Sequence, residues 1–269
     1  AGVDAPPMAA ADAVSVVGAG GGNVTKDFGN VVSIAQKFGL RREEVPCLVK
    51  CAKYWDNGSV ERVSARLAEA RPDYDKWAGY RNSVLNYYVP LEYGFDKIIE
   101  LCDEKIAETL GEAGDDGILG MSRGYYYMAC KTIAQGVSKW IENYARRAEY
   151  LAEHETDAQQ KKEYLDIAAV AHHIAHKQPE TFRQALNLTL MCHYGVTNED
   201  PHSGQSIGRL GQILYPWYEK DIADGTTNDE EVIELLELYR IKITAIECFA
   251  SSGVTGGVLS GNTFNNLSI

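Results

Sequence analysis

The stretch from Ser206 to Gly225, "SIGRLGQILYPWYEKDIADG", changes character halfway along. Its first half carries apolar residues at mixed spacing, and its second half crowds two tyrosines and a tryptophan around Pro216. A first helical turn tolerates proline, because the missing N–H would have no partner there anyway. We therefore predict an extended entry, a turn at the glycine-arginine pair, and a helix over residues 215–223.

The composition of the whole chain is that of a globular protein. The 269 residues are 45% hydrophobic and 24% charged, which is enough to build a sizeable core. A net charge of -12 repels phosphate backbones, and no long basic patch offsets it. No apolar run approaches the roughly 18 residues of a membrane span, and the six cysteines form no dense disulfide framework. We expect a cytoplasmic protein that binds neither nucleic acid nor membrane.

Beyond a Gly- and Ala-rich irregular segment over residues 1–40, the apolar residues recur with the period of helices. The predicted helices span 43–55, 59–70, 91–110, 125–154, 157–176, 179–194, 215–223 and 228–249. Thr181 and Asn228 are typical helix-start residues. After Gly253 the helical period stops, and a glycine-rich loop running into a strand is predicted. We expect the chain to end inside that strand.

A glycine-rich motif near the start, "VSVVGAGGGN", is similar to a dinucleotide-binding loop. In that fingerprint the last position is a glycine, and a second strand ends in an acidic residue that binds ribose. Here Asn23 takes the last glycine position, and no clear second strand follows. A flexible small-residue segment is the favoured interpretation.

Three histidines in "AHHIAHK" are spaced so that two imidazoles share one helix face. His172, His173 and His176 are compatible with a metal site in which a remote side chain supplies the third ligand. The alternative is a half-exposed helix end, where histidines face the negative pole of the helix. We favour the helix end and predict no metal site. An aromatic cluster of Trp77, Tyr80, Tyr87 and Tyr88 similarly suits either the core or a pocket wall.

Several motifs in fixed order extend these observations to a family. They are "YARRAEYLA" from Tyr144, "TFRQAL" from Thr181, the Gly208-Arg209-Leu210 step and "LYPWYEKDIADG" from Leu214. Upstream, "CAKYWDNGSVER" and "YGFDKII" continue the series. Together they resemble the glycyl radical enzymes of the pyruvate formate-lyase-like class, from about residue 41 to residue 269.

The resemblance implies an α/β fold, a ten-stranded barrel wrapped in helices. Residues 41–269 then form a predominantly helical part of that domain with the first barrel strands, incomplete at its C-terminal end. The stretch Ser206–Gly225 would pass from an extended piece near the barrel into an outer helix. Gly208 would permit a tight backbone there, and Arg209 would be a buried or semi-buried anchor.

The resemblance also implies the chemistry. In this family a radical-SAM activating enzyme places a radical on a C-terminal glycine, which passes it to a cysteine inside the barrel, and the thiyl radical takes hydrogen from the substrate. Cys102-Asp103-Glu104 and Ala78-Gly79-Tyr80 echo the two radical motifs, but in the wrong order and region. We therefore expect no catalytic residue in this chain, no bound cofactor, and a glycyl radical installed beyond Ile269.

The implied reaction is radical cleavage of a C–C or C–heteroatom bond in a small organic substrate, as in a lyase, decarboxylase or dehydratase. Two alternatives are a fumarate-adding enzyme, which "GYYYMACKTIAQG" resembles, and a non-catalytic helical interaction module. The activating enzyme and a second copy in a homodimer are the expected partners. The candidate substrate contacts are Gln205 and Ser206 on one side and Tyr80, Asn82, Tyr87 and Tyr88 on the opposite wall.

Overall fold

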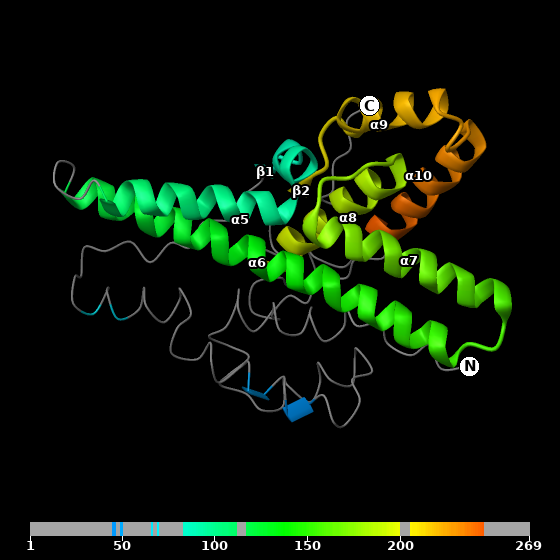
Figure 1. The fold of residues 1–269 in the computed structure, drawn as a ribbon, viewed down its shortest axis with the longest axis horizontal. Coiled ribbons are helices and arrows are strands. Elements are labelled where there is room, and N and C mark those ends of the chain that lie inside the picture. The colour runs from blue at the N-terminus through cyan, green and yellow to red at the C-terminus, as the bar shows by residue number, and fades with distance from the viewer. Residues whose placement is uncertain are drawn as a thin grey trace. The chain divides into compact units, whose positions relative to one another are not determined.

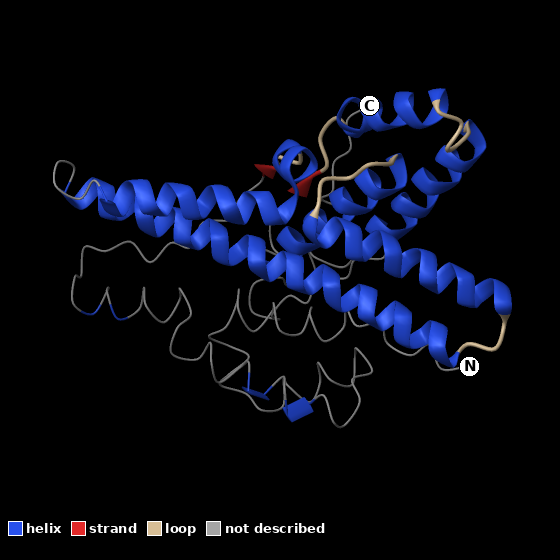
Figure 2. Cartoon of the chain, viewed as in Figure 1, coloured by secondary structure: helices blue, strands red, loops and turns tan. Residues whose placement is uncertain are grey.

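The computed structural model describes residues 45–46, 49–50, 66, 69, 83–111, 117–199 and 205–244, which are mostly helical (Figures 1 and 2). Their elements are β1 Ser83–Val84, α5 Tyr88–Gly111, α6 Gly117–His154, α7 Ala158–His176, α8 Phe182–Glu199, β2 Gln205–Ser206, α9 Leu210–Ala223 and α10 Asp229–Thr244. The helices predicted over 43–55 and 59–70 lie almost entirely outside these residues, and the strand predicted after Gly253 lies wholly outside them.

The chain divides into two compact units. Residues 1–85, 193–208 and 242–267 form the first, which contains β1 and β2. Residues 86–192 and 209–241 form most of the second, which contains α5, α6, α7 and α9. Across the described residues, no helix combines the length and the apolar character that crossing a membrane requires.

The second unit is organised around α6, which lies alongside both α5 and α7 (Figure 1). The buried residues of α6 recur every three or four positions: Ala134, Ser138, Ile141, Ala145, Ala148 and Ala152. This is the spacing that keeps one stripe of a helix facing a partner. The facing helix α7 buries Ala168, Ala171, Ile174 and Ala175. Because most of these side chains are small, the two backbones approach closely along the seam.

The helix α5 is kinked at Gly94, which has φ 69° and ψ 166°. A Cβ atom at this position would lie 2.5 Å from the backbone nitrogen of Gln178 and 2.8 Å from the backbone oxygen of His176. Only glycine combines a positive φ with such an approach of another backbone. The "YGFDKII" motif therefore marks the point where α5 meets the end of α7.

Hydrogen bonds from the stretch Ser206–Gly225 hold α9 against residues 179–182 at the start of α8. Asp221 accepts a hydrogen bond from the backbone N–H of Phe182 at 2.7 Å. The indole N–H of Trp217 donates to the carbonyl of Pro179 at 2.9 Å, and Lys220 donates to the carbonyl of Glu180 at 2.9 Å. The "TFRQAL" and "LYPWYEKDIADG" motifs therefore belong to one structural junction.

The helix α9, in the stretch Ser206–Gly225, begins earlier than predicted. It starts at Leu210, so Pro216 lies inside it and not in its first turn. Leu210, Ile213 and Leu214 are buried, which is the i, i+3, i+4 pattern of a helix. Our prediction gave too much weight to the proline.

The glycine-arginine pair gives one confirmation and one correction. Gly208 has φ 74°, which confirms the tight backbone predicted there. Arg209 is exposed, so its prediction as a buried or semi-buried anchor is wrong. Arg209 occupies the N-cap position of α9 without a capping hydrogen bond from its side chain.

Other helix boundaries differ at glycines. The helix α6 begins at Gly117, before the predicted start at Tyr125, and α8 continues past Tyr194 to Glu199. The predicted helices left out "GILGMSRG" and the residues after Tyr194, yet a glycine costs a helix only about 1 kcal/mol. The helix starts predicted at Thr181 and Asn228 are confirmed, because Thr181 Oγ1 accepts from Gln184 N and Asn228 Oδ1 from Glu231 N.

Candidate functional site

In the first unit, β1 and β2 form a parallel pair. Ser83 lies opposite Gln205, and Val84 lies opposite Ser206. Two parallel strands need a long crossover connection, and the helices from α5 to α8 provide it. The pairing places β1, which follows Tyr80 and Asn82 in the sequence, beside β2, which contains the predicted substrate contacts Gln205 and Ser206.

The described residues cover the six predicted contacts unevenly. Ser206 is half-buried in β2, and it precedes the fully buried Ile207. The backbone of Gln205 is described as part of β2. Tyr80 and Asn82 lie outside the described residues. The role of all four toward a substrate stays a prediction.

Tyr87 and Tyr88 belong to the second unit and have opposite surroundings. Tyr87 is 1% exposed, whereas Tyr88 is 57% exposed. Burial, and then the neighbouring Tyr239 and Cys192, raise the pKa of Tyr87 far above its usual value. Burial also raises the pKa of Tyr239 to about 12 and that of the Cys192 thiol to about 12. Tyr87 therefore carries a neutral phenol within a desolvated cluster.

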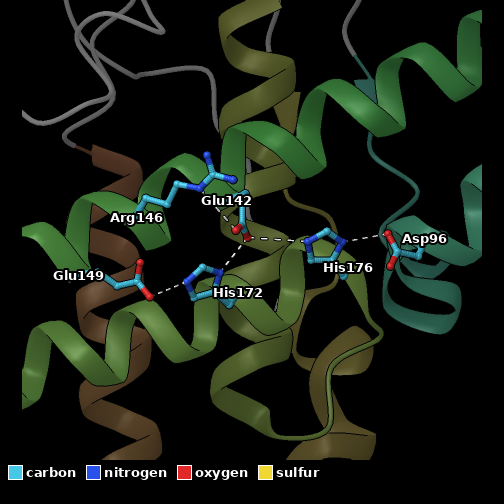
Figure 3. Close-up of polar contacts among 6 residues, drawn as sticks. All are labelled: Asp96, Glu142, Arg146, Glu149, His172 and His176. Carbon is cyan, nitrogen blue, oxygen red and sulfur yellow. Dashed lines mark hydrogen bonds and ion pairs between the residues drawn. The ribbon is translucent and has the colours of Figure 1, made fainter.

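Two residues of the three-histidine motif, His172 and His176, lie near the end of α7 and meet carboxylates from two other helices (Figure 3). His172 Nδ1 is 2.9 Å from Glu142 Oε2, and His172 Nε2 is 2.9 Å from Glu149 Oε1. His176 Nδ1 is 3.0 Å from Asp96 Oδ1 in α5. We call the six residues drawn in Figure 3 the carboxylate–histidine cluster: Asp96, Glu142, Arg146, Glu149, His172 and His176.

Two opposing effects act on the pKa of His172. Partial burial lowers it, but hydrogen bonds to Glu149 and Glu142, together with their negative charges, outweigh burial and raise the pKa above its usual value. A doubly protonated ring suits this position, because only that form has an N–H on each ring nitrogen. Within the cluster, the protonated form of His172 is therefore favoured more than it is in a free imidazole.

The structure agrees with the interpretation of a helix end for His173 and His176, which lie in the last turn of α7. His173 Nε2 bonds the carbonyl oxygen of Gln178 at 2.8 Å just past the helix. Over the part of the chain that the structure describes, no group of three or more His, Cys, Asp or Glu side chains is arranged to hold a metal ion.

The carboxylates that contact His172 and His176 were not predicted from the sequence. Glu142 and Glu149 are seven residues apart on α6, at the edge of its buried stripe, and that spacing is a signal that could have indicated a common face. Asp96 carried no comparable signal, because its contact with His176 depends on how α5 kinks at Gly94.

Cys102 has the surroundings of a structural thiol. It lies within α5 and is buried, and burial is the main cause that raises its pKa. A reactive cysteine needs the opposite shift, toward the thiolate. This supports leaving Cys102 out of the chemistry. Gly79 lies outside the described residues.

Comparisons with known proteins agree on one family. The family model described as "Pyruvate formate lyase-like" matches residues 32–269. The 4-hydroxyphenylacetate decarboxylase glycyl radical subunit of Clostridium scatologenes is 61% identical over 99% of this chain and 31% of its own length. The subunit of the same name from Clostridioides difficile is 54% identical over 96% of this chain and 30% of its length.

The fold is also similar to solved structures. The glycerol-bound B12-independent glycerol dehydratase from Clostridium butyricum superposes with a TM-score of 0.65 at 18% identity, over 99% of this chain and 33% of that protein. The chain thus spans about 30% of the length of the two decarboxylase subunits that it matches.

Proposed function

Because this chain belongs to the pyruvate formate lyase-like family, we propose that it is part of a glycyl radical enzyme that decarboxylates a hydroxyarylacetate such as 4-hydroxyphenylacetate. One observation carries this proposal. Two subunits named for that reaction are 61% and 54% identical over nearly the whole chain, whereas a glycerol dehydratase of the same fold is 18% identical.

The net reaction breaks the bond between the carboxylate carbon and the adjacent CH₂ carbon. Carbon dioxide leaves, a proton is taken up, and the CH₂ group becomes CH₃, so no net oxidant or reductant is consumed. A radical-SAM activating enzyme would place the radical on a glycine outside this chain, and a cysteine outside this chain would carry it to the substrate. Closing the site against water would protect the reactive intermediates.

The part proposed for this chain is to build one side of the site. We infer that β1 and β2 are the first strands of the ten-stranded barrel, in keeping with their parallel pairing. On this proposal Gln205 and Ser206 offer hydrogen bonds to the polar ends of the substrate. Tyr80, Asn82, Tyr87 and Tyr88 stay proposed substrate contacts. The enzyme would work as a cytoplasmic homodimer.

The test uses the complete polypeptide that contains this chain. It is incubated without oxygen with its activating enzyme, S-adenosylmethionine and a reductant, and then given 4-hydroxyphenylacetate. We expect a glycyl-type doublet in electron paramagnetic resonance, together with release of CO₂ and 4-methylphenol. Glycerol and trans-4-hydroxyproline serve as dehydratase substrates for comparison, and 4-methylphenol with fumarate tests radical addition.

Each other outcome points to a different function. A doublet accompanied by dehydration or fumarate addition, without CO₂ release, would replace the decarboxylase assignment. No doublet with an activating enzyme that is competent on another substrate protein would favour the non-catalytic helical module.

A further inference from the structure

The carboxylate–histidine cluster joins three helices through two imidazole rings (Figure 3). His172 of α7 lies between Glu142 and Glu149 of α6, so that its ring bridges two carboxylates along one side of that helix. His176, one turn further along α7, meets Asp96 of α5 and approaches the same Glu142 oxygen at 3.8 Å. All these residues belong to the second unit.

The number of protons on the His172 ring decides how many hydrogen bonds it can donate to the two glutamates. A neutral imidazole has one N–H and one lone pair, so it can donate to only one of the two carboxylates that face His172. Its other ring nitrogen would then turn a lone pair toward a carboxylate oxygen 2.9 Å away. An imidazolium donates to both, and such charge-assisted bonds are stronger than neutral ones.

The surroundings of His172 carry more negative than positive fixed charge. The titratable and charged groups that face it or its partners are Glu142, Arg146 and Glu149 on α6, Asp96 on α5, and His176 on α7. Arg146 is the competing cation, and its Nε atom lies 3.7 Å from Glu142 Oε1. Three carboxylates thus face one guanidinium, and a proton on His172 offsets part of the difference.

We propose that a proton on His172 acts as a pH-sensitive clasp, which holds α7 against α6 next to the point where His176 meets Asp96 at the kinked start of α5. The end of α7 is the correct place for such a device. The backbone of residues 176–178 packs against Gly94 so closely that no side chain fits there. A loosening of α7 therefore reaches the kink of α5 directly.

The direction of the pH dependence follows from the raised pKa of His172 in the folded protein. Stabilisation by the clasp is fully present below the unfolded-state pKa of about 6.5. It is lost as pH rises through the higher pKa of the folded state. Alkaline conditions therefore open the clasp.

Hydrogen exchange of the complete polypeptide, followed by mass spectrometry, measures the clasp where it acts. Peptides covering residues 139–152 and 165–178 are compared between wild type and His172→Gln from pH 6 to pH 9, after correction for intrinsic exchange rates. We expect wild-type protection in both peptides to exceed that of the variant by roughly 3- to 10-fold at pH 6, as two partly exposed ion pairs allow. The difference should disappear by the alkaline end.

Two variants sharpen the result. His154→Gln is the matched control, because His154 bonds only the carbonyl of Tyr150 in its own helix in the described structure, and it should leave the pH profile of both peptides unchanged. Glu149→Gln removes one partner while keeping His172, so it should flatten the wild-type profile. High salt should weaken the clasp in wild type, because the cluster is partly exposed.

Equal pH profiles for wild type, His172→Gln and Glu149→Gln would overturn the proposal. So would a wild-type protein whose two helices become more protected, relative to the His154→Gln control, as pH rises. Each of these outcomes is read from exchange and not from turnover, so the proposal can fail while the decarboxylase assignment stands.

Discussion

The carboxylate of Asp221 in α9 accepts a hydrogen bond from the backbone N–H of Phe182, the first residue of α8, at 2.7 Å. Asp221 is 1% exposed, and it is one of four polar or charged residues buried in the described structure. A carboxylate at a helix N-terminus satisfies an unpaired N–H and interacts favourably with the helix dipole. Asp221 of α9 therefore stabilises the start of α8.

Removing this cap should destabilise the protein. Asp221→Ala leaves the buried N–H of Phe182 without its partner, so we expect a loss of about 1–3 kcal/mol in the free energy of unfolding. The exposed Asp224, three residues later, provides the control, and Asp224→Ala should change stability by less than about 0.5 kcal/mol. Denaturant unfolding of the complete polypeptide compares the two. Equal losses in both variants would mean that the Asp221 bond carries no special weight.

Gly94→Ala tests the close approach between α5 and the end of α7. A side chain there meets both a positive φ and backbone atoms at 2.5 Å, so we expect a loss of about 2 kcal/mol or more. Gly136 in α6 is the matched control, because a Cβ at that position meets nothing within 4 Å. Gly136→Ala should stabilise the helix by about 0.5–1 kcal/mol. Thermal unfolding midpoints that move in the same direction for both variants would contradict the geometry at Gly94.

The seam between α6 and α7 should resist larger side chains. Ala148 is 5% exposed within the buried stripe of α6, so Ala148→Leu forces extra atoms into a filled contact and should cost about 1–3 kcal/mol. Ala129, on the exposed side of the same helix, is the control, and Ala129→Leu should be nearly neutral. Circular dichroism during thermal unfolding would reveal the difference. A tolerated leucine at position 148 would mean that the helices separate easily.

The sequence predicted the long helices well because their periodicity is a local property. The three- and four-residue spacing of apolar positions in α6 and α7 is visible in the letters alone, and both helices end where predicted, at His154 and His176. Errors arose where a single residue type was given too much weight, as with Pro216 in α9 and the glycines at the start of α6. Tertiary packing overrides such preferences at a cost of only about 1 kcal/mol per glycine.

Contacts between helices and strands could not be predicted from the sequence. The strands β1 and β2 are two residues long, which is too short for the alternation that identifies a strand. The ion pairs of His172 depend on the rotation of α6 relative to α7, and that of His176 depends on the kink of α5. A single sequence contains the residues of such a cluster but not the rotation of one helix against another.

Ser206→Ala tests the predicted substrate contact that the structure describes most directly. The half-buried Ser206 lies opposite Val84 in the pair of β1 and β2. On the proposed function its hydroxyl would offer one hydrogen bond to a polar group of the substrate. A lost hydrogen bond to a charged group is worth about 1.5–3 kcal/mol, so kcat/KM for 4-hydroxyphenylacetate should fall by roughly 10- to 100-fold. On the proposed function the radical is installed outside this chain, so the glycyl doublet should keep its wild-type intensity. Thr132→Ala is the control, since that hydroxyl bonds the carbonyl of Met128 in its own helix, and it should leave both measurements unchanged. If Ser206→Ala turns over at the wild-type rate, Ser206 does not contact the substrate; if the doublet is lost as well, its role is in folding or activation and not in binding.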